Sequence, residues 1–359
     1  MNTIIVLGNG FDLQVGLKSS FDDYFREFWR KVDSIPYVNN ILDKALYSEW
    51  ITLWHIYFKV LYEKKDWNSW MDVELEILNS LKGEFWEKVL LYCNEEYNLG
   101  KATDQNNLEY VHAEIIKRRY AKPFNVRLDG TKSRFYEILL DELKMFEKDF
   151  AKYLKHQVDD IVGREQYQKR QEELFKKLLD KTDTKYTLNG YSSSGGDAQS
   201  EVQILSFNYT KLSEKILESR KYLNVHGTID NGPILGICGR SIPEDRIGHL
   251  DIFTKSHRIE MSMPGTMGKI LKNSEDNNII FYGCSFGEQD YTYYKILTDM
   301  RGAGKIYCCY TDYPDSAGGS VNRKNEHIAK YRSYFRKNYN EEYLSNLIHK
   351  NKLEAILID

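Results

Sequence analysis

The short apolar run Ile4–Leu7 stands near the start of the chain and leads directly into Gly8 and Gly10. A run of this length without polar positions is typical of a strand that is buried on both faces, as in parallel sheets. A helix is expected to begin near Ser19 and Ser20, because two acids follow in its first turn, where the helix dipole favours negative charge. Residues 1–40 therefore predict one buried strand followed by one helix.

Residues from about 41 to about 181 show a helical and highly charged pattern. Apolar residues recur at spacings of three and four from Phe135 to Leu154, which is the pattern of one amphipathic helix. The segment 163–181 alternates in charge sign and predicts a helix with a solvated face. These patterns predict an α-helical insertion domain over residues 41–200, which ends in the polar, glycine-rich segment 187–200.

Strand patterns return after this segment, and helical patterns lie between some of them. The predicted strands are 202–207, 222–225, 234–237, 278–282 and 305–310, and the predicted helices are 211–219, 291–300 and 325–348. Strands that alternate with helices indicate an α/β sheet with helices on its faces. We therefore predict a Rossmann-like parallel sheet flanked by helices, a nucleotide-binding domain formed by residues 1–40 and 201–359.

The composition excludes several classes of protein. The formal net charge of −3 gives no global basic field that would attract nucleic acid. The five cysteines are scattered and contain no CxxC pair, so neither a disulfide framework nor a zinc site is expected, and no other metal is expected. No apolar run approaches the length of a membrane span, and the first residues do not resemble a signal peptide. We expect a soluble, cytoplasmic protein without a membrane partner.

Candidate chemistry lies where the predicted strands end. Gly8 and Gly10 follow the first strand, and a turn without side chains lets backbone N–H groups approach a phosphate. The dinucleotide spacing GxGxxG fails at Leu13, so a tight turn without a ligand is the alternative. Asn208 can donate and accept hydrogen bonds at once. His226 is a candidate general base, or alternatively a hydrogen-bonded structural histidine.

Gly283 and Ser285 repeat the opening pattern at the end of a later strand. Ligands of α/β sheets bind beyond the carboxyl ends of the strands. Four strand-end signals in this order therefore predict that distant segments converge on one crevice.

Two families share these motifs. The chain resembles sirtuins and sirtuin-like NAD-cleaving domains in the order of Gly8-Asn9-Gly10-Phe11-Asp12, Gly16-Leu17, Ser206-Phe207-Asn208, His226-Gly227 and Gly283-Cys284-Ser285. It resembles the bacteriophage abortive-infection AbiH family more closely, in Gly8 to Leu13, Trp70-Met71-Asp72-Val73-Glu74, Phe207 to Thr210, His226-Gly227, and Ser285 with Asp290.

The resemblance implies an antiphage abortive-infection protein with a sirtuin-like fold that hydrolyses NAD at the nicotinamide–ribose bond. His226 and Asn208 would be catalytic. The residues expected to bind NAD are Gly8, Asn9, Gly10, Phe11, Asp12, Gly16, Ser206, Asn208, Gly227, Gly283, Ser285 and Asp290. A phage-derived trigger and a homo-oligomer are further expectations.

Two departures limit the resemblance. The paired CxxC motifs of sirtuin deacylases are absent, so lysine deacylation is not implied. Asp12 stands where sirtuins have Ser, which would place an acid near the phosphates. One alternative is a sensor that binds an NAD-like nucleotide without cleaving it. Another is a toxin such as a nuclease, for which Asp12, Asp72, Glu74 and Asp290 are the available acids. Asp72 and Glu74 point to different faces of a helix, so a helix-start acid and a solvated or ion-paired acid are the simpler roles.

Overall fold

The computed structural model divides into two compact units. It describes residues 2–34, 43–45, 48–63, 72–94, 107–121, 132–160, 164–182, 184, 187–188, 191–192, 201–218, 220–262, 276–302, 304–312 and 324–358. The sheet unit comprises Met1–Ser19, Leu154–Asn231 and Ser262–Asp359, and the helical unit comprises Ser20–Tyr153 and Gly232–Met261. These bounds differ from the predicted domains, because 20–40 and 232–261 belong with the helices and 154–200 belongs with the sheet.

The sheet has six parallel strands in the order β10-β9-β8-β1-β4-β5. Their bounds are β1 Asn2–Leu7, β4 Val202–Ser206, β5 Lys221–Asn224, β8 Asn277–Tyr282, β9 Ile306–Tyr310 and β10 Leu353–Leu357. Counted along the chain this is the doubly wound order 3-2-1-4-5-6, which reverses direction between β1 and β8. The prediction of a Rossmann-like α/β fold is confirmed.

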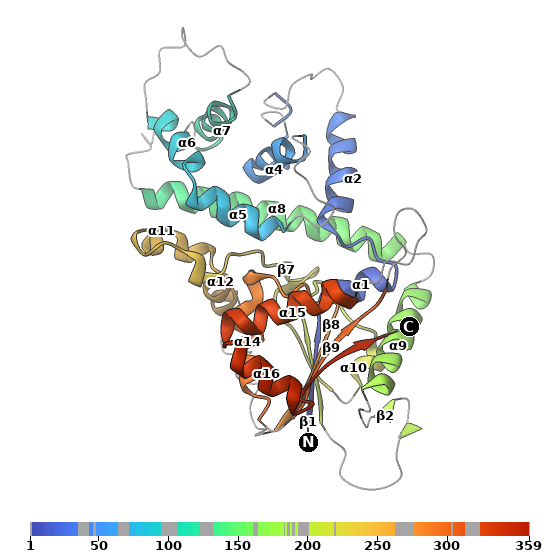
Figure 1. Cartoon of the computed structure of the whole chain (residues 1–359). Coiled ribbons are helices and arrows are strands. Elements are labelled where there is room, and N and C mark those ends of the chain that lie inside the picture. Colours follow the sequence, from blue (N-terminus) through green and yellow to red (C-terminus); the bar gives the residue numbers. More distant parts are fainter. Residues whose placement is uncertain are drawn as a thin grey trace. The chain divides into compact units, whose positions relative to one another are not determined.

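Helix α9 (Arg164–Lys181) covers one face of the sheet (Figure 1). Ile5, Ile204 and Ile280 lie side by side on this face and share one buried core with Phe175 and Leu178 of the helix. The segment 163–181 was predicted to have a solvated face, and its charges do alternate. Its apolar positions nevertheless provide the cover that a parallel sheet needs on both faces.

Helices α14 (Tyr291–Asp299) and α15 (Lys324–Asn338) cover the opposite face (Figure 1). Phe281 of β8 packs against Tyr294 with the ring planes at 84°, and Tyr294 in turn contacts Tyr334. The predicted helix 325–348 is in fact two helices, because Asn340 caps the backbone N–H of Tyr343 and starts α16 (Glu341–His349). The strand β10 that follows was not predicted.

The helical unit contains most of the long helices. Its elements are α2 Phe21–Asp33, α4 Leu53–Glu63, α5 Val73–Lys82, α6 Phe85–Asn94, α7 Leu108–Ile116, a π-helix Lys117–Ala121, the first part of α8 (Lys132–Asp160), β7 Gly232–Pro233, α11 Ile247–Leu250 and α12 Lys255–Ser262. Short elements of the sheet unit are α1 Gly10–Gln14, β2 Thr187–Leu188, β3 Tyr191–Ser192, α10 Glu214–Leu217 and β6 Gly227–Thr228. Ser20 caps α2 by accepting from the N–H of Asp23, so the predicted helix start is confirmed. In the described part of the chain, no helix has the length and apolar character to cross a membrane.

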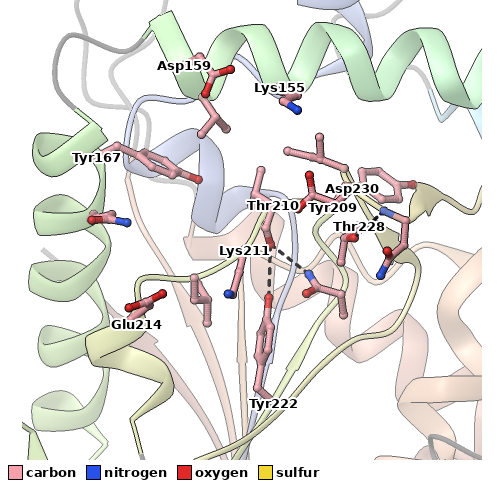
Figure 2. A pocket seen from close by; sticks show the side chains of 16 residues that line it. Lys155, Asp159, Tyr167, Tyr209, Thr210, Lys211, Glu214, Tyr222, Thr228 and Asp230 are labelled. Atoms are coloured by element: carbon pink, nitrogen blue, oxygen red, sulfur yellow. Dashed lines mark hydrogen bonds between the residues drawn. The ribbon is translucent and has the colours of Figure 1, made fainter.

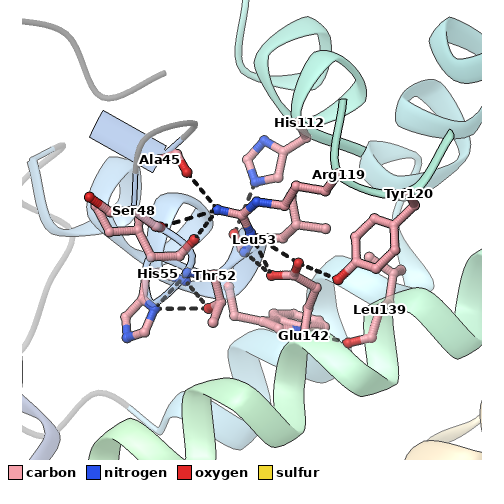
Figure 3. Close-up of polar contacts among 12 residues, drawn as sticks. Ala45, Ser48, Thr52, Leu53, His55, His112, Arg119, Tyr120, Leu139 and Glu142 are labelled. Atoms are coloured by element: carbon pink, nitrogen blue, oxygen red, sulfur yellow. Dashed lines mark hydrogen bonds and ion pairs between the residues drawn. The ribbon is translucent and has the colours of Figure 1, made fainter. Parts of the chain in front are cut away.

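A buried arginine–glutamate pair joins separate segments of the helical unit (Figure 3). The Arg119 guanidinium lies 3.0 Å from Glu142 Oε1 and also donates to the carbonyl oxygens of Ala45 and Ile51, both at 2.7 Å. Glu142 is fully buried and accepts from the N–H of Leu53 at 2.8 Å. A buried carboxylate is tolerated only when it is paired and hydrogen-bonded in this way.

The segment 234–237 does not form a strand of the sheet, so that prediction is wrong. The N–H of Leu235 donates to Glu147 Oε1 at 2.7 Å, and the N–H of Gly236 donates to Glu74 Oε1 at 2.9 Å. The two backbone groups that a strand would use are therefore bound by carboxylates. Glu147 also pairs with Arg258, and Glu74 lies 2.6 Å from Lys255 Nζ. These two ion pairs fix the segment 232–261 to α5 and α8.

Candidate functional site

The turns after β1 and β8 touch at the point where the strand order reverses. The N–H of Gly8 donates to the carbonyl of Tyr282 at 2.9 Å, and the N–H of Gly10 donates to the carbonyl of Gly283 at 3.0 Å. A Cβ on Gly8 would lie 2.5 Å from the oxygen of Gly283, and one on Gly10 would lie 2.6 Å from its Cα. The glycines are therefore required by the close contact of two strand ends. Their predicted contact with a phosphate stays a prediction.

The neighbours of these glycines have contacts of their own. Phe11 is fully buried and packs edge-on against Tyr282, with the ring centroids 6.1 Å apart. Asn9 is exposed, and its Oδ1 accepts from the hydroxyl of Ser19 at 2.6 Å. Gly16 follows α1 with a φ of +92°. Phe11 thus supports the turn from the core, whereas Asn9 lies on its surface.

Asp12 is held by two hydroxyl groups. Its side chain is 1% exposed, and it accepts from Thr210 Oγ1 at 2.5 Å and from the Tyr167 hydroxyl at 3.3 Å. Burial raises the pKa of Asp12 to about 6, although the hydrogen bonds from Thr210 and Tyr167 act in the opposite direction. Thr210 and Tyr167 lie 198 and 155 residues away in the chain. Thr210 ends the Phe207–Thr210 motif, but nothing in the sequence indicates that either residue contacts Asp12. The buried carboxyl group of Asp12 therefore has two protein partners.

His226 is buried at the end of β5 and meets a residue that follows β8. Its Nε2 lies 3.4 Å from Asp290 Oδ1, and only 3% of the residue is exposed. The ring packs edge-on against Phe207, with the centroids 4.9 Å apart and the planes at 83°. Tyr293 of α14 contacts the same imidazole with the centroids 5.8 Å apart. The structure thus brings together the ends of β4, β5 and β8 around His226.

Asn208 has a buried amide with no hydrogen-bond partner among the described residues. Both Oδ1 and Nδ2 lack a partner, although only 3% of the residue is exposed. Its backbone is fixed, because its N–H donates to Ser206 Oγ at 3.2 Å and its carbonyl accepts from Asn224 Nδ2 at 2.7 Å. Buried amides are normally hydrogen-bonded, and an unsatisfied one is costly. The side chain of Asn208 is therefore available to bind a polar ligand.

Three other predicted residues have simple surroundings. Ser206 is buried, and its hydroxyl accepts a hydrogen bond from the backbone N–H of Asn208. Ser285 is exposed, and its hydroxyl accepts from the N–H of Gly287 at 3.2 Å. Gly227 directly follows His226 with a φ of +78°, which favours glycine.

The predicted residues form two clusters on opposite sides of the sheet edge. Phe207 contacts Tyr294 of α14, so the His226 cluster lies toward the face that α14 covers. Asp12 contacts Tyr167 of α9, so the Asp12 cluster lies toward the other face. The sequence predicted one crevice, and the structure assigns Asp12 and His226 to different clusters.

A pocket opens beside the Asp12 cluster (Figure 2). It has a volume of about 570 Å³ and lies at the carboxyl ends of β4 and β5, against the end of α8 and the start of α9. Its walls include Tyr167, Gln168, Tyr209, Thr210, Tyr222 and Asn224. His226, Asn208 and Asp290 do not line it.

The acids considered for a metal are engaged separately. Asp72 Oδ1 accepts from the N–H groups of Glu74 and Leu75 and caps α5, which confirms its role as a helix-start acid. Glu74 is ion-paired with Lys255 rather than solvated. Trp70, the first residue of that motif, lies outside the described residues. Within the described ranges, no three His, Cys, Asp or Glu side chains are grouped so as to hold a metal ion.

Comparison with known proteins identifies the family. A family model described as bacteriophage abortive infection AbiH matches residues 4–311, a range that includes most of β1, all of β4, β5, β8 and β9, and every strand-end motif described above. No curated protein matches the chain. Because the family model covers well over half of the sequence, the chain belongs to the bacteriophage abortive infection AbiH family.

Proposed function

We propose that this protein carries out the abortive-infection role of its family by hydrolysing NAD at the nicotinamide–ribose bond. The observation that supports this most directly is the unsatisfied amide of Asn208, buried at the same sheet edge as His226 and Asp290. In a doubly wound sheet this edge, near the reversal of strand order, is where nucleotides bind. The resemblance to sirtuin-like NAD-cleaving domains is part of the proposal.

The reaction needs few groups from the protein. Water attacks C1′ of the nicotinamide-bearing ribose, the C–N bond breaks with its electron pair passing to the ring nitrogen, and neutral nicotinamide leaves. The products are nicotinamide, ADP-ribose and one proton. Asn208 would orient the nicotinamide carboxamide, because an amide can donate to its oxygen and accept from its nitrogen.

His226 would accept the proton of the attacking water, as a general base does. Asp290 Oδ1 lies 3.4 Å from its Nε2, so the carboxylate would stabilise the imidazolium that forms. Phe207 and Tyr293 pack on the ring and limit its rotation. A phage-derived trigger and a homo-oligomer are further parts of the proposal.

The test measures free nicotinamide from NAD, with purified protein and in phage-infected cells that express it. His226→Ala should lower turnover by about 10²- to 10⁴-fold, the usual contribution of a general base, while NAD binding persists. Asn208→Leu should weaken NAD binding as well as turnover, because it removes both hydrogen-bonding groups. His349→Ala, at an exposed position in α16, is the matched control and should leave turnover unchanged. NAD that binds without releasing nicotinamide would replace hydrolysis with the sensor alternative, and full turnover by His226→Ala would remove the proposed base.

A further inference from the structure

We propose that the pocket beside Asp12 is a second binding site, distinct from the His226 cluster, and that it takes an uncharged nucleoside. This inference does not depend on NAD hydrolysis. It follows from the size, the walls and the charge of the pocket.

The volume of about 570 Å³ is within the range of pockets that bind small molecules. Three tyrosines from three different segments line it: Tyr167 from α9, Tyr209 from the turn after β4, and Tyr222 from β5. Tyrosine rings bind planar groups by stacking and apolar contact, at little cost in conformational entropy. A ligand with a flat ring therefore fits these walls.

The floor of the pocket is held by hydrogen bonds (Figure 2). The carbonyl of Thr210 accepts from the Tyr222 hydroxyl at 3.3 Å and from Asn224 Nδ2 at 3.0 Å. Asn224 Nδ2 also donates to the carbonyl of Asn208, so both of its protons are used. Its Oδ1 accepts none of the hydrogen bonds found among the described residues and remains an acceptor at the pocket. The floor of the pocket is thus preorganised, and a ligand that donates a hydrogen bond to Asn224 Oδ1 would fit it.

The charges of the lining argue against an anion. Two lysines, Lys155 and Lys211, are outnumbered by three carboxylates, Asp159, Glu214 and Asp230, which gives the lining a net charge of −1. Carboxylates accept hydrogen bonds from hydroxyl groups, as on a ribose. A phosphate would be repelled by the excess negative charge. The expected ligand thus has a flat ring, hydroxyl groups and an amino group that donates a hydrogen bond, but no phosphate. A nucleoside such as adenosine has these features.

Two tryptophan variants of α9 distinguish binding in this pocket from binding elsewhere on the protein. Gln168 is half-buried and lines the pocket, whereas Lys176 lies two helical turns further along, exposed and outside the lining. Gln168→Trp fills the pocket with a bulky ring, and Lys176→Trp places the same ring elsewhere on the helix. The probes are adenosine and adenosine monophosphate, measured by isothermal titration calorimetry. The melting temperature of each variant confirms that it is folded.

Adenosine should bind the wild-type protein with a Kd below about 1 mM. Gln168→Trp should weaken adenosine binding at least about 10-fold, because the new side chain reduces the pocket volume. Lys176→Trp should leave adenosine binding unchanged. Adenosine monophosphate should bind about 3- to 10-fold more weakly than adenosine, because of the charge repulsion. His226→Ala should retain adenosine binding, even if it abolishes nicotinamide release. Unchanged binding by Gln168→Trp, tighter binding of the monophosphate, loss of binding in His226→Ala, or no adenosine binding at all would each overturn the proposal.

Discussion

Asp12 provides a direct test of the electrostatics at the sheet edge. The substitution Asp12→Asn keeps the shape of the side chain but removes its titration. Thr210 can still donate to the amide oxygen, and the Tyr167 hydroxyl can accept from the amide nitrogen instead of donating. The variant should therefore fold with the same contacts and differ from the wild type mainly in its response to pH.

The size of the effect follows from the pKa of Asp12, which burial raises from 3.8 to about 6. The folded state thus binds this proton more tightly than the unfolded state does. The stabilisation that the protonated carboxyl group of Asp12 gives to the folded state is fully present below pH 3.8. It is lost as the pH rises through about 6, where the buried carboxyl group must carry its charge. At about 1.4 kcal/mol for each pH unit between the two pKa values, the free energy of unfolding should fall by about 3 kcal/mol relative to Asp12→Asn.

Urea unfolding of both proteins, followed by far-ultraviolet circular dichroism at several pH values between 4 and 7.5, measures this difference. The stability of the wild type relative to Asp12→Asn should decline across the lower part of the range and level off above about pH 6.5. Asp141→Asn, at an exposed position of α8, is the control and should show no such trend. A difference that stays constant across the range would refute the reasoning, because it would mean that the carboxyl group of Asp12 titrates as it does in the unfolded chain.

Three further predictions concern stability, each measured as a change in chemical or thermal unfolding. Gly283→Ala should cost about 2–4 kcal/mol, because the backbone has a φ of +68° and a Cβ would lie 2.5 Å from the nitrogen of Phe11; a loss below about 1 kcal/mol would contradict the tight contact. Glu147→Gln should cost about 3–5 kcal/mol because it leaves Arg258 buried without a carboxylate, and the double variant with Arg258→Met should recover part of that loss. Asp72→Ala should cost only about 1 kcal/mol, the usual contribution of an exposed helix cap, and a loss as large as that of Glu147→Gln would assign Asp72 another role.

The sequence predicts the elements whose signal is local. Ile4–Leu7 and the predicted strands that match β4, β8 and β9 are short and mainly apolar, so their burial can be inferred without knowledge of their partners. β10 was missed because its residues after Leu353 are half-exposed and include Glu354, which breaks the apolar pattern. The segment 234–237 is apolar like a strand, but the carboxylates that bind its N–H groups lie far away in the sequence.

The candidate site divides in the same way. The meeting of His226 with Asp290 follows from the rule that ligand-binding groups gather beyond the carboxyl ends of strands. The partners of Asp12 could not be inferred, because the side of the sheet to which a side chain turns after a strand end is set by tertiary packing. The contact of Gly8 with Gly283 shows that one sequence pattern can have two physical causes. A glycine-rich turn predicts a close backbone approach, and the approaching group here is another strand end.

The position of β1 has a consequence for the synthesis of the protein. β1 leaves the ribosome before both of its neighbours in the sheet, which begin at residues 202 and 277, where Thr3 pairs with Val202 and Asn2 with Asn277. At about 5–20 residues per second, the nascent chain carries an unpaired apolar strand for about 10–40 seconds before β4 emerges. The sheet unit cannot form its two central strand pairs until the ribosome has translated β4 and β8. A ribosome that stalls before β4 is translated would therefore release a chain with an exposed, aggregation-prone strand.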